Sequence, residues 1–356
     1  MNHPARRPSL ALLLLPLLPL LPTACSDDGR TPLVIYSPHG PDIGAEFEAL
    51  FEAAHPDVDV RYQGLETGAI LTRVRGESAN PGADVWWGAP ASTFTIAAEE
   101  GLLETYRPTW IDRVDALYRD AEDRFAPHFI IPQILIYNRD RMAAEEAPRS
   151  WDDLTADEYH GRIVLRNPPP SGSMRGAFSW LVAWKAGNDL EGVDRGFEYL
   201  RAVHRNTKKY GAQPRELFEA IKRDRDRVVG MWNLADAIFQ RDRYEYPFGI
   251  VVPEEGVPIV IDCIAIVKDE DRDPARAAAA RAFYEFVTSL ESGRKLMHEH
   301  GRMLVRDDVP ADDLPAWHAE YAYRPLPVES SFAAEHADAW MARWEAEVKP
   351  MDRDGP

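Results

Sequence analysis

Small polar side chains occupy a turn near the middle of the chain, where they could hold an anion. The turn Ser171-Gly172-Ser173 follows three prolines and precedes a long apolar segment with helical periodicity. A helix N-terminus presents unpaired N–H groups and the positive end of the helix dipole, and serine hydroxyls add further donors. We therefore expect this turn to bind an oxyanion. Serine is also a common N-cap, so the same residues could simply begin a helix.

Two further segments carry polar groups where an apolar, strand-like run ends. Ser37-Pro38-His39 offers a hydroxyl and an imidazole just before the next helix, and both are candidate ligand contacts. Ser37 could instead stabilise the turn, with His39 on the surface. Ser92 follows the third apolar run, where capping of a helix and contact with a ligand are both compatible with the sequence.

Three residues later in the chain complete the candidate site. Trp232 and Asn233 end an apolar run and could supply a stacking face and an amide. Trp232 fits a core position equally well. Asp262 lies within another apolar run, where its carboxylate could meet a ligand hydroxyl or only hold the backbone in place.

Sequence signatures of common catalytic sites are missing. The chain has no Gly-x-Ser-x-Gly elbow, no Walker loop and no spacing typical of metal ligands. The histidines of His298-Glu299-His300 are two residues apart and so do not share a helix face, which favours a solvated helix end. We therefore expect a binding protein without a cofactor or a resident metal, and not an enzyme.

Strand-like and helical segments alternate along most of the chain, and this order places the candidate ligand contacts relative to one another. The strand-like runs are 33–36, 58–62, 83–87, 130–137, 162–165, 228–232 and 259–267. Helical periodicity fills the intervals, most clearly in the alanine-rich segment 275–287. Such alternation predicts an α/β fold with mostly parallel sheets covered on both faces. Ligands in these folds bind at the carboxyl ends of the strands, where the candidate residues lie.

The N-terminus reads as an export signal. Arg6 and Arg7 precede a leucine-rich core at 10–21, which is too short to span a bilayer. Thr23-Ala24-Cys25 then resembles a bacterial lipobox, although Pro22 stands where a leucine is usual. We expect residues 1–24 to be removed and Cys25 to be lipidated, anchoring the protein to a membrane. Ordinary cleavage near Ala24, giving a free periplasmic protein, is the alternative.

Charge and cysteine content restrict the partners. The chain has a net charge of −18, and losing residues 1–24 leaves 39 basic against 59 acidic side chains. An acidic surface of this kind repels nucleic acid and anionic lipid, so neither is an expected partner. Beyond Cys25 only Cys263 remains, so an intramolecular disulfide is excluded and stability must come from a hydrophobic core.

Several short segments occur in an order that resembles the family 1 and family 6 extracellular solute-binding proteins of ABC importers. The branch is the one that includes binders of ferric iron, phosphorylated sugars and aminoethylphosphonate. The segments that carry the resemblance are 33–39, 80–88 (Asn-Pro-Gly-Ala-Asp-Val-Trp-Trp-Gly), 100–103, 136–138, 151–154, 159–163, 167–173, 252–256 and 264–268.

The resemblance implies a two-lobed, type II periplasmic binding protein fold with a hinge. Lobe 1 would hold residues 31–129 and 265–310, and lobe 2 would hold 135–260. C-terminal helices at 311–349 would pack across the back, and 350–356 would form a tail. The implied role is capture of a small molecule by a periplasmic monomer that delivers it to ABC permease and ATPase subunits. A sensor-linked receptor with the same fold is the alternative.

One difference from the ferric-iron members of the family narrows the range of candidate ligands. Those proteins use two adjacent tyrosines after the strand that 228–232 resembles, whereas this chain has Met-Trp-Asn-Leu-Ala-Asp at 231–236, and Tyr244 and Tyr246 are not adjacent. We therefore expect an anionic organic solute such as a phosphorylated or phosphonate compound. Ferric iron stays an alternative, as does a polyamine or thiamine held by Trp232 with Trp86 or Trp87.

Overall fold

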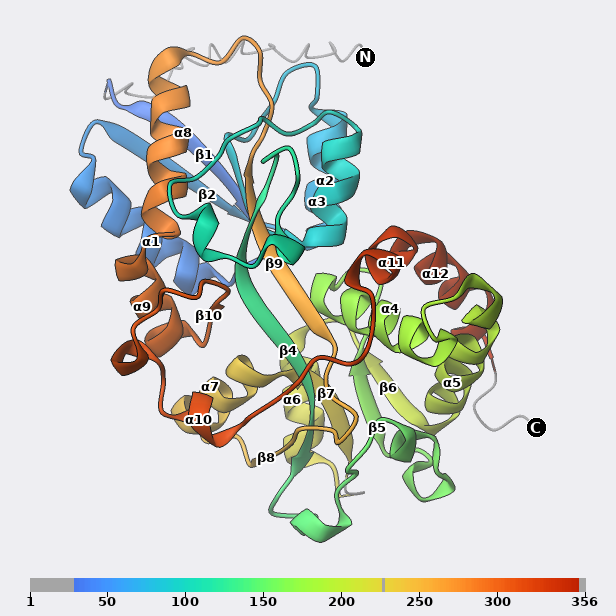
Figure 1. Ribbon diagram of the computed structural model, residues 1–356. Helices are drawn as coiled ribbons and strands as arrows, with labels where there is room; N and C mark the ends of the chain where they lie inside the picture. The colour runs from blue at the N-terminus through green and yellow to red at the C-terminus, as the bar shows by residue number, and fades with distance from the viewer. Residues whose placement is uncertain (1–28, 226–227, 352–356) are drawn as a thin grey trace, which may run out of the picture.

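The computed structural model describes residues 29–225 and 228–351, which form two α/β lobes joined by long strands (Figure 1). Residues 1–28, 226–227 and 352–356, and with them the expected signal peptide, Cys25 and most of the expected tail, lie outside the described residues. No helix in the described part is long and apolar enough to cross a membrane.

Lobe 1 is built on a sheet whose first strands run parallel. The strand order is β2 (Val58–Gly64), β1 (Thr31–Ser37), β3 (Val85–Pro90), β9 (Ile259–Ile266) and β4 (Ala126–Asn138). β1 pairs in parallel with β2 and β3, while β9 runs antiparallel between β3 and β4. The short β10 (Met303–Leu304) pairs with β4.

Lobe 2 repeats this arrangement on the other half of β4. The order continues from β4 to β7 (Val229–Asn233), β5 (Ile163–Arg166) and β6 (Thr207–Gly211), with β8 (Phe248–Val251) also paired with β4. β5 is parallel to β6 and β7, and β7 is antiparallel to β4. Each lobe therefore has parallel outer strands and antiparallel strands at the junction, the mixed α/β architecture expected from the sequence.

The strand β4 belongs to both sheets and so links the lobes. Its first half, Ala126 to Pro132, pairs with β9, and its second half, Gln133 to Tyr137, pairs with β7. Because one half of β4 lies in each sheet, this strand connects the two lobes directly. Among the described strands, β9 pairs with β3 and with the first half of β4, so the chain lies in the lobe-1 sheet from Ile259.

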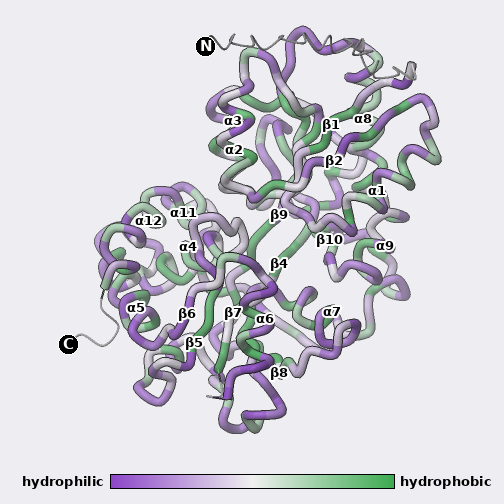
Figure 2. Tube along the Cα trace, turned by 180° about the vertical axis from the view of Figure 1, so that it is seen from behind, coloured by the Kyte–Doolittle hydropathy of each residue, from purple (hydrophilic) through white to green (hydrophobic). Residues whose placement is uncertain are grey.

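Helices cover both sheets and follow most of the strands (Figures 1 and 2). Those on lobe 1 are α1 (Pro41–Ala54), α2 (Thr67–Gly76), α3 (Ala91–Glu99), α8 (Pro274–Val287) and α9 (Leu290–His300). Those on lobe 2 are α4 (Gly172–Ala186), α5 (Val193–Asn206), α6 (Pro214–Arg223) and α7 (Leu234–Tyr244). The C-terminal segment adds α10 (Trp317–Glu320), α11 (Ser330–Glu335) and α12 (Ala337–Arg343), and α11 and α12 pack on α4.

The hydrophobic pattern predicted the central strands well, because each is a run of buried apolar residues. The strands β6, β8 and β10 were missed. Thr-Lys-Lys-Tyr-Gly of β6 carries exposed lysines and lacks an apolar run, and β8 and β10 have only four and two residues. The expectation that Trp86 and Trp87 face opposite sides of one strand is confirmed, because each belongs to a different core cluster. Trp340 and Trp344 are buried in the core, as expected for the last helix.

Candidate ligand-binding site

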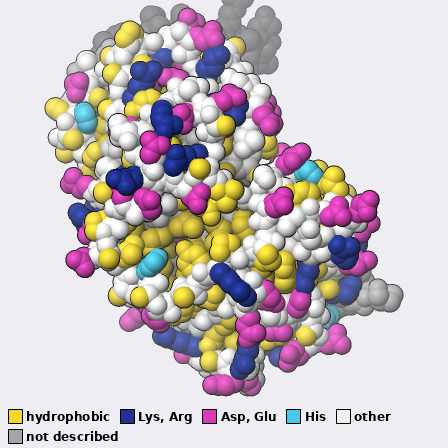
Figure 3. Space-filling view, in the orientation of Figure 1, with side chains coloured by type: hydrophobic (Ala, Val, Ile, Leu, Met, Phe, Trp, Pro, Cys, Tyr) yellow, Lys and Arg dark blue, Asp and Glu magenta, His cyan; other side chains and the backbone are white. Residues whose placement is uncertain are grey.

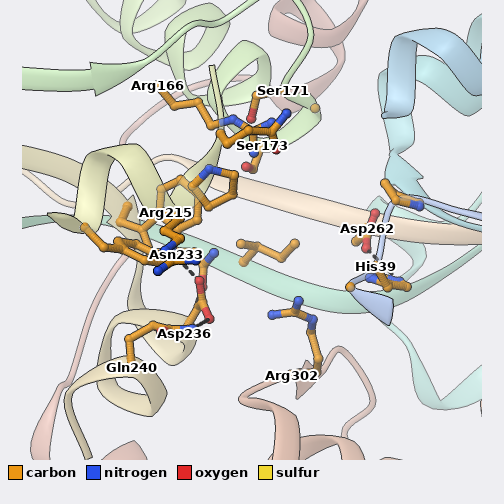
Figure 4. Close-up of a pocket in the computed structure, with 18 of the residues that line it drawn as sticks. His39, Arg166, Ser171, Ser173, Arg215, Asn233, Asp236, Gln240, Asp262 and Arg302 are labelled. Atoms are coloured by element: carbon orange, nitrogen blue, oxygen red, sulfur yellow. Dashed lines mark hydrogen bonds and ion pairs between the residues drawn. The ribbon is translucent and has the colours of Figure 1, made fainter. Parts of the chain in front are cut away.

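A cavity of about 1000 Å³ lies between the lobes and is lined by residues of both. Figure 3 shows hydrophobic side chains gathered where the lobes meet, and Figure 4 shows polar side chains converging on the cavity. Ile131 and Val260, from the two strands at the junction, lie among the lining residues. The cavity therefore has a wall on each lobe and is bordered by the linking strands.

Helix N-termini from both lobes open onto this cavity. In lobe 1 they are those of α1, α2 and α3, which follow β1, β2 and β3, and in lobe 2 those of α4, α6 and α7, which follow β5, β6 and β7. Each turn lies at the carboxyl end of its strand, as the α/β topology predicts. The converging N–H groups and helix dipoles create a region suited to negative charge.

The Ser171-Gly172-Ser173 turn forms part of this wall. Ser171 is the N-cap of α4 and its hydroxyl accepts the Met174 N–H at 3.5 Å, so the capping interpretation is confirmed for this residue. The Ser173 hydroxyl has no hydrogen-bond partner among the described residues and is open to the cavity. Ser173 is therefore the better donor for a ligand.

The glycine of this turn permits close approach of the two lobes. A Cβ atom at Gly172 would lie 2.7 Å from Pro90 Cδ and 3.0 Å from Thr67 Oγ1, both in lobe 1. Real Cβ atoms do not come this close to such neighbours. Any larger residue at 172 would therefore push the lobes apart.

An ion pair also crosses the cavity. Arg166, at the end of β5 in lobe 2, donates from one terminal nitrogen to both carboxylate oxygens of Glu66 at 3.0 Å. Glu66 precedes α2 in lobe 1, and the Arg166 side chain is only 8% exposed. The sequence analysis missed this pair, although the position of Arg166 at a strand end was a usable signal.

Two more arginines were missed. Arg215 lies in the first turn of α6, and Arg302 follows α9; both line the cavity (Figure 4). Neither side chain has a hydrogen bond or an ion pair within residues 29–225 and 228–351. Arg302 lies far along the sequence from the other site residues and follows no strand, so no local signal marked it.

His39 and Asp262 form a buried pair on the lobe-1 wall. His39 Nε2 lies 3.6 Å from Asp262 Oδ2, and both side chains are more than nine-tenths buried. Burial raises the pKa of Asp262 to about 7, although nearby Arg302 opposes this effect. Burial also holds the pKa of His39 well below its ordinary value, with Arg302 acting in the same direction. The histidine is therefore neutral, and its Nε2 has no hydrogen-bond partner in the described structure.

Trp232 and Asn233 line the lobe-2 wall, but their polar atoms are already engaged. The Trp232 indole N–H donates to the Asp236 carboxylate, and the Asn233 side chain accepts the Asp236 N–H at 2.8 Å. Asn233 is thus the N-cap of α7. Because Trp232 is only 5% exposed, it can offer a ligand no more than the edge of its ring.

Two candidate residues are not brought to the cavity. Ser37 is fully buried, and its hydroxyl accepts the His39 N–H at 3.1 Å, so it shapes the turn. Ser92 lines a separate cavity of about 260 Å³ between α3, α4 and α11. Trp86 and Trp87 are fully buried in the core and do not line the cavity, which corrects the expectation that one of them could cage a cation.

The fold and the interlobe cavity define a type II periplasmic binding protein. Similar solved structures include the ferric binding protein from Campylobacter jejuni, with a TM-score of 0.76, 20% identity and coverage of 89% of this chain and 99% of that one. Another is the periplasmic binding protein AfuA from Actinobacillus pleuropneumoniae with exogenous fructose-6-phosphate bound, with a TM-score of 0.75, 22% identity and coverage of 91% and 100%.

Sequence comparison gives the family. Residues 84–319 match the family model described as bacterial extracellular solute-binding protein, and the chain belongs to this family. A probable ABC transporter periplasmic-binding protein y4fP of Sinorhizobium fredii is 26% identical over 318 residues, which cover 89% of this chain and 86% of the relative. Family membership identifies the chain as a substrate-binding component of an ABC importer and implies a periplasmic location.

Proposed function

We propose that this protein captures an oxyanion-bearing organic solute, of the phosphorylated-sugar or phosphonate type, in the interlobe cavity and delivers it to a membrane permease. The observation that carries the proposal is the convergence of helix N-termini from both lobes on one cavity. Ser173, Arg215 and Arg302 add donors that have no partner among the described residues. Such groups are suited to an anion that arrives with several oxygen acceptors.

The acidic surface does not oppose this proposal. The net charge of −18 is distributed over the whole chain, and surface charges are screened beyond about 8 Å at physiological ionic strength. Helix N-termini and arginines act at hydrogen-bond distance inside the cavity. The fructose-6-phosphate named for AfuA is consistent with a ligand of this class in the same fold.

Ferric iron is the alternative suggested by Tyr244 and Tyr246, which both line the cavity. The Tyr246 hydroxyl, however, donates to Glu219 at 3.0 Å, and burial raises the pKa of its phenol. A phenolate ligand would have to abandon that hydrogen bond and lose a proton. No group of three or more His, Cys, Asp or Glu residues in the described part of the chain is arranged to hold a metal ion.

A cation such as a polyamine or thiamine would need free carboxylates and an aromatic cage. Glu66 is paired with Arg166. The Asp236 carboxylate accepts a hydrogen bond from the Trp232 indole N–H, and Asn233 accepts the Asp236 backbone N–H at the start of the same helix. Asp262, with a pKa of about 7, is only partly ionised at neutral pH. Of the carboxylates that line the cavity, only Asp42, in the first turn of α1, has no hydrogen bond or ion pair among the described residues, so the cavity favours a cation less than the number of its carboxylates suggests.

The test is a comparison of two serine variants. The purified protein is titrated calorimetrically with phosphosugars, phosphonates, polyamines and Fe³⁺, and Ser173→Ala and Ser92→Ala are titrated with the tightest binder. A hydrogen bond to a charged group contributes about 1.5–3 kcal/mol, so Ser173→Ala should weaken binding roughly tenfold to a hundredfold. Ser92→Ala, which alters a different cavity, should bind as the wild type does. Equal affinity of wild type and Ser173→Ala, or binding of polyamine or Fe³⁺ alone, contradicts the proposal.

We further propose that the mature protein is anchored through a lipid on Cys25. The support is the short apolar segment at 10–21 followed by Thr23-Ala24-Cys25. Cys25→Ala should move the protein from the membrane fraction to the soluble periplasmic fraction. A wild-type protein that is already soluble and begins at another residue would contradict the anchor without affecting the ligand.

A further inference from the structure

The lobe-2 side of the cavity carries aromatic side chains that oxyanion binding does not use. Phe218 comes from α6, Trp232 from β7, Tyr244 from the end of α7, and Tyr246 from the loop before β8. All four line the same cavity as the Ser171–Ser173 turn. We call these four residues the aromatic wall.

Contacts among these rings hold most of the wall in place. The ring centroid of Phe218 lies 5.1 Å from that of Trp232 in an edge-to-face arrangement, and 5.7 Å from that of Tyr246. The Trp232 N–H is held by Asp236, and the Tyr246 hydroxyl by Glu219. A surface fixed in this way loses little conformational entropy when a ligand packs on it.

Tyr244 is the exposed member of the aromatic wall. It is 48% exposed, and it is one of four large hydrophobic residues in the described part of the chain that are more than a third exposed. The others in that group, Leu50, Leu117 and Leu190, do not line this cavity. An aromatic ring exposed at a ligand cavity has a face available for an apolar partner.

The size of the cavity also exceeds what an oxyanion needs. A volume of about 1000 Å³ is at the upper end of the range for sites that bind drug-sized organic molecules. An oxyanion at Ser173 would occupy only part of a cavity that the aromatic wall also lines. Polar side chains border the wall as well: Lys222 Nζ lies 5.0 Å from the Tyr246 ring centroid, and Gln240 lines the cavity.

We propose that the aromatic wall is a second subsite, which takes a ring with an apolar face attached to the oxyanion of the solute. The inference rests on the proposed function, because the oxyanion at Ser173 sets where the ring lies. The ring could be aromatic or could be the apolar face of a sugar, which both pack against tyrosine and tryptophan. A short-chain phosphate or phosphonate would leave the wall unused.

The experiment compares probes that differ only in the group attached to phosphate. Methyl phosphate, phenyl phosphate and glucose 6-phosphate are titrated calorimetrically into wild type, Tyr244→Ala and Tyr244→Phe. We expect at least one ring-bearing phosphate to bind about tenfold more tightly than methyl phosphate. Tyr244→Ala should remove most of that preference without changing the affinity for methyl phosphate, whereas Tyr244→Phe, which keeps the ring, should retain it. The stronger of the two ring probes shows whether the subsite suits an aromatic ring or a sugar.

A fourth probe separates this inference from the proposed function. Phenol has the ring without the oxyanion, and its weak binding is followed by saturation-transfer NMR on wild type and Tyr244→Ala. A Tyr244-dependent phenol signal, together with phosphates that bind no better than phenol, supports the aromatic wall and contradicts the oxyanion site. The aromatic wall is refuted if methyl phosphate binds as tightly as both ring phosphates and the phenol signal is the same in the two proteins. It is also refuted if Tyr244→Ala weakens methyl phosphate as much as the ring phosphates.

Discussion

The two walls of the ligand cavity are built on the same plan but offer different chemistry. Both present helix N-termini at the carboxyl ends of parallel strands. On the lobe-1 wall, His39 and Asp262 are buried and face each other, and Arg302 is the donor left open to the cavity. On the lobe-2 wall, Ser173 and Arg215 are open to the cavity, beside the aromatic wall.

The difference in burial separates two roles. Desolvation penalises charge, so the buried pair on lobe 1 is close to neutral at pH 7, with Asp262 near its pKa and His39 uncharged. The open groups on lobe 2 keep their full donor capacity for a ligand. We infer that Ser173 and Arg215 on lobe 2, together with Arg302 on lobe 1, supply the attraction for the solute, and that the buried pair on lobe 1 adds little charge.

The largest effect is expected from separating the walls. Gly172→Val would place side-chain atoms against Pro90 and Thr67, so the lobes could not meet. Affinity for the solute should fall about a hundredfold or more, since contacts from the lobe-1 wall are lost together. Small-angle scattering should give a larger radius of gyration at saturating ligand than for the wild type.

A matched control is Gly68→Val. Gly68 also lies in the first turn of a helix at the cavity, but a Cβ there meets nothing within 4 Å. It should reproduce the effect of replacing glycine by valine in a first helical turn, where valine is no worse a helix former than glycine, without changing the radius of gyration. If both variants bind and close like the wild type, the two walls do not act together.

A smaller effect is expected from removing the ion pair that joins the walls. Glu66→Gln weakens the contact with Arg166, and the ligand-free protein should populate the open state about tenfold more. The estimate is modest because the Glu66 carboxylate is 41% exposed and partly screened by solvent. Spin labels on the two lobes, measured without ligand by pulsed electron resonance, report the change.

The control removes a comparable pair within one lobe. Arg75 donates to both Glu100 oxygens at 2.6 Å, and both residues belong to lobe 1. Glu100→Gln should leave the distance distribution between the lobes unchanged. An equal change in both variants would mean that Glu66 affects folding rather than closure.

The smallest effect is a pH dependence that arises on the lobe-1 wall. Because the pKa of Asp262 is about 7, its carboxylate is mostly charged at pH 8 and mostly neutral at pH 6. An anion should therefore bind about threefold more tightly at pH 6, once repulsion by Asp262 is gone. Asp262→Asn should bind as the wild type does at pH 6 and should lose this dependence. Tighter binding at pH 8 would indicate a cationic ligand.

Asp262 should also affect how folding stability depends on pH, and in the opposite direction to a carboxylate whose pKa is lowered by folding. Its folded-state pKa is raised from 3.8, so the native state binds more protons than the unfolded state between about pH 4 and pH 7. The contribution of Asp262 to stability is therefore fully present below that window and is lost as the pH rises through it. Thermal unfolding at pH 5 and pH 8 should show a smaller loss of stability in Asp262→Asn than in the wild type. A pH profile unaffected by this substitution would show that Asp262 titrates normally.

The sequence by itself determined the fold class and the class of site. Buried strands are continuous apolar runs, and their order with the helices implies an α/β fold whose ligand lies at the strand ends. The Ser171–Ser173 turn could be found because serine and glycine between a strand and a helix mark a helix N-terminus, whether they cap it or bind a ligand there. The position of a polar residue at a strand end did not identify a ligand contact at Ser37 or Asn233. The side-chain oxygens of both residues accept hydrogen bonds from backbone N–H groups two or three residues further on.

Only the tertiary structure decided which residues share the cavity. Arg302 follows α9, yet its charge acts on Asp262 and His39, which lie far from it in sequence. Arg166 meets Glu66, and Gly172 meets Pro90, because β4 and β9 bring the lobes together. Burial likewise depends on what packs around a side chain, so the raised pKa of Asp262 could not be obtained from its neighbours in the chain. Local turns depend on short-range hydrogen bonds that the sequence specifies directly, whereas contacts across the cavity depend on how two sheets that share β4 are arranged.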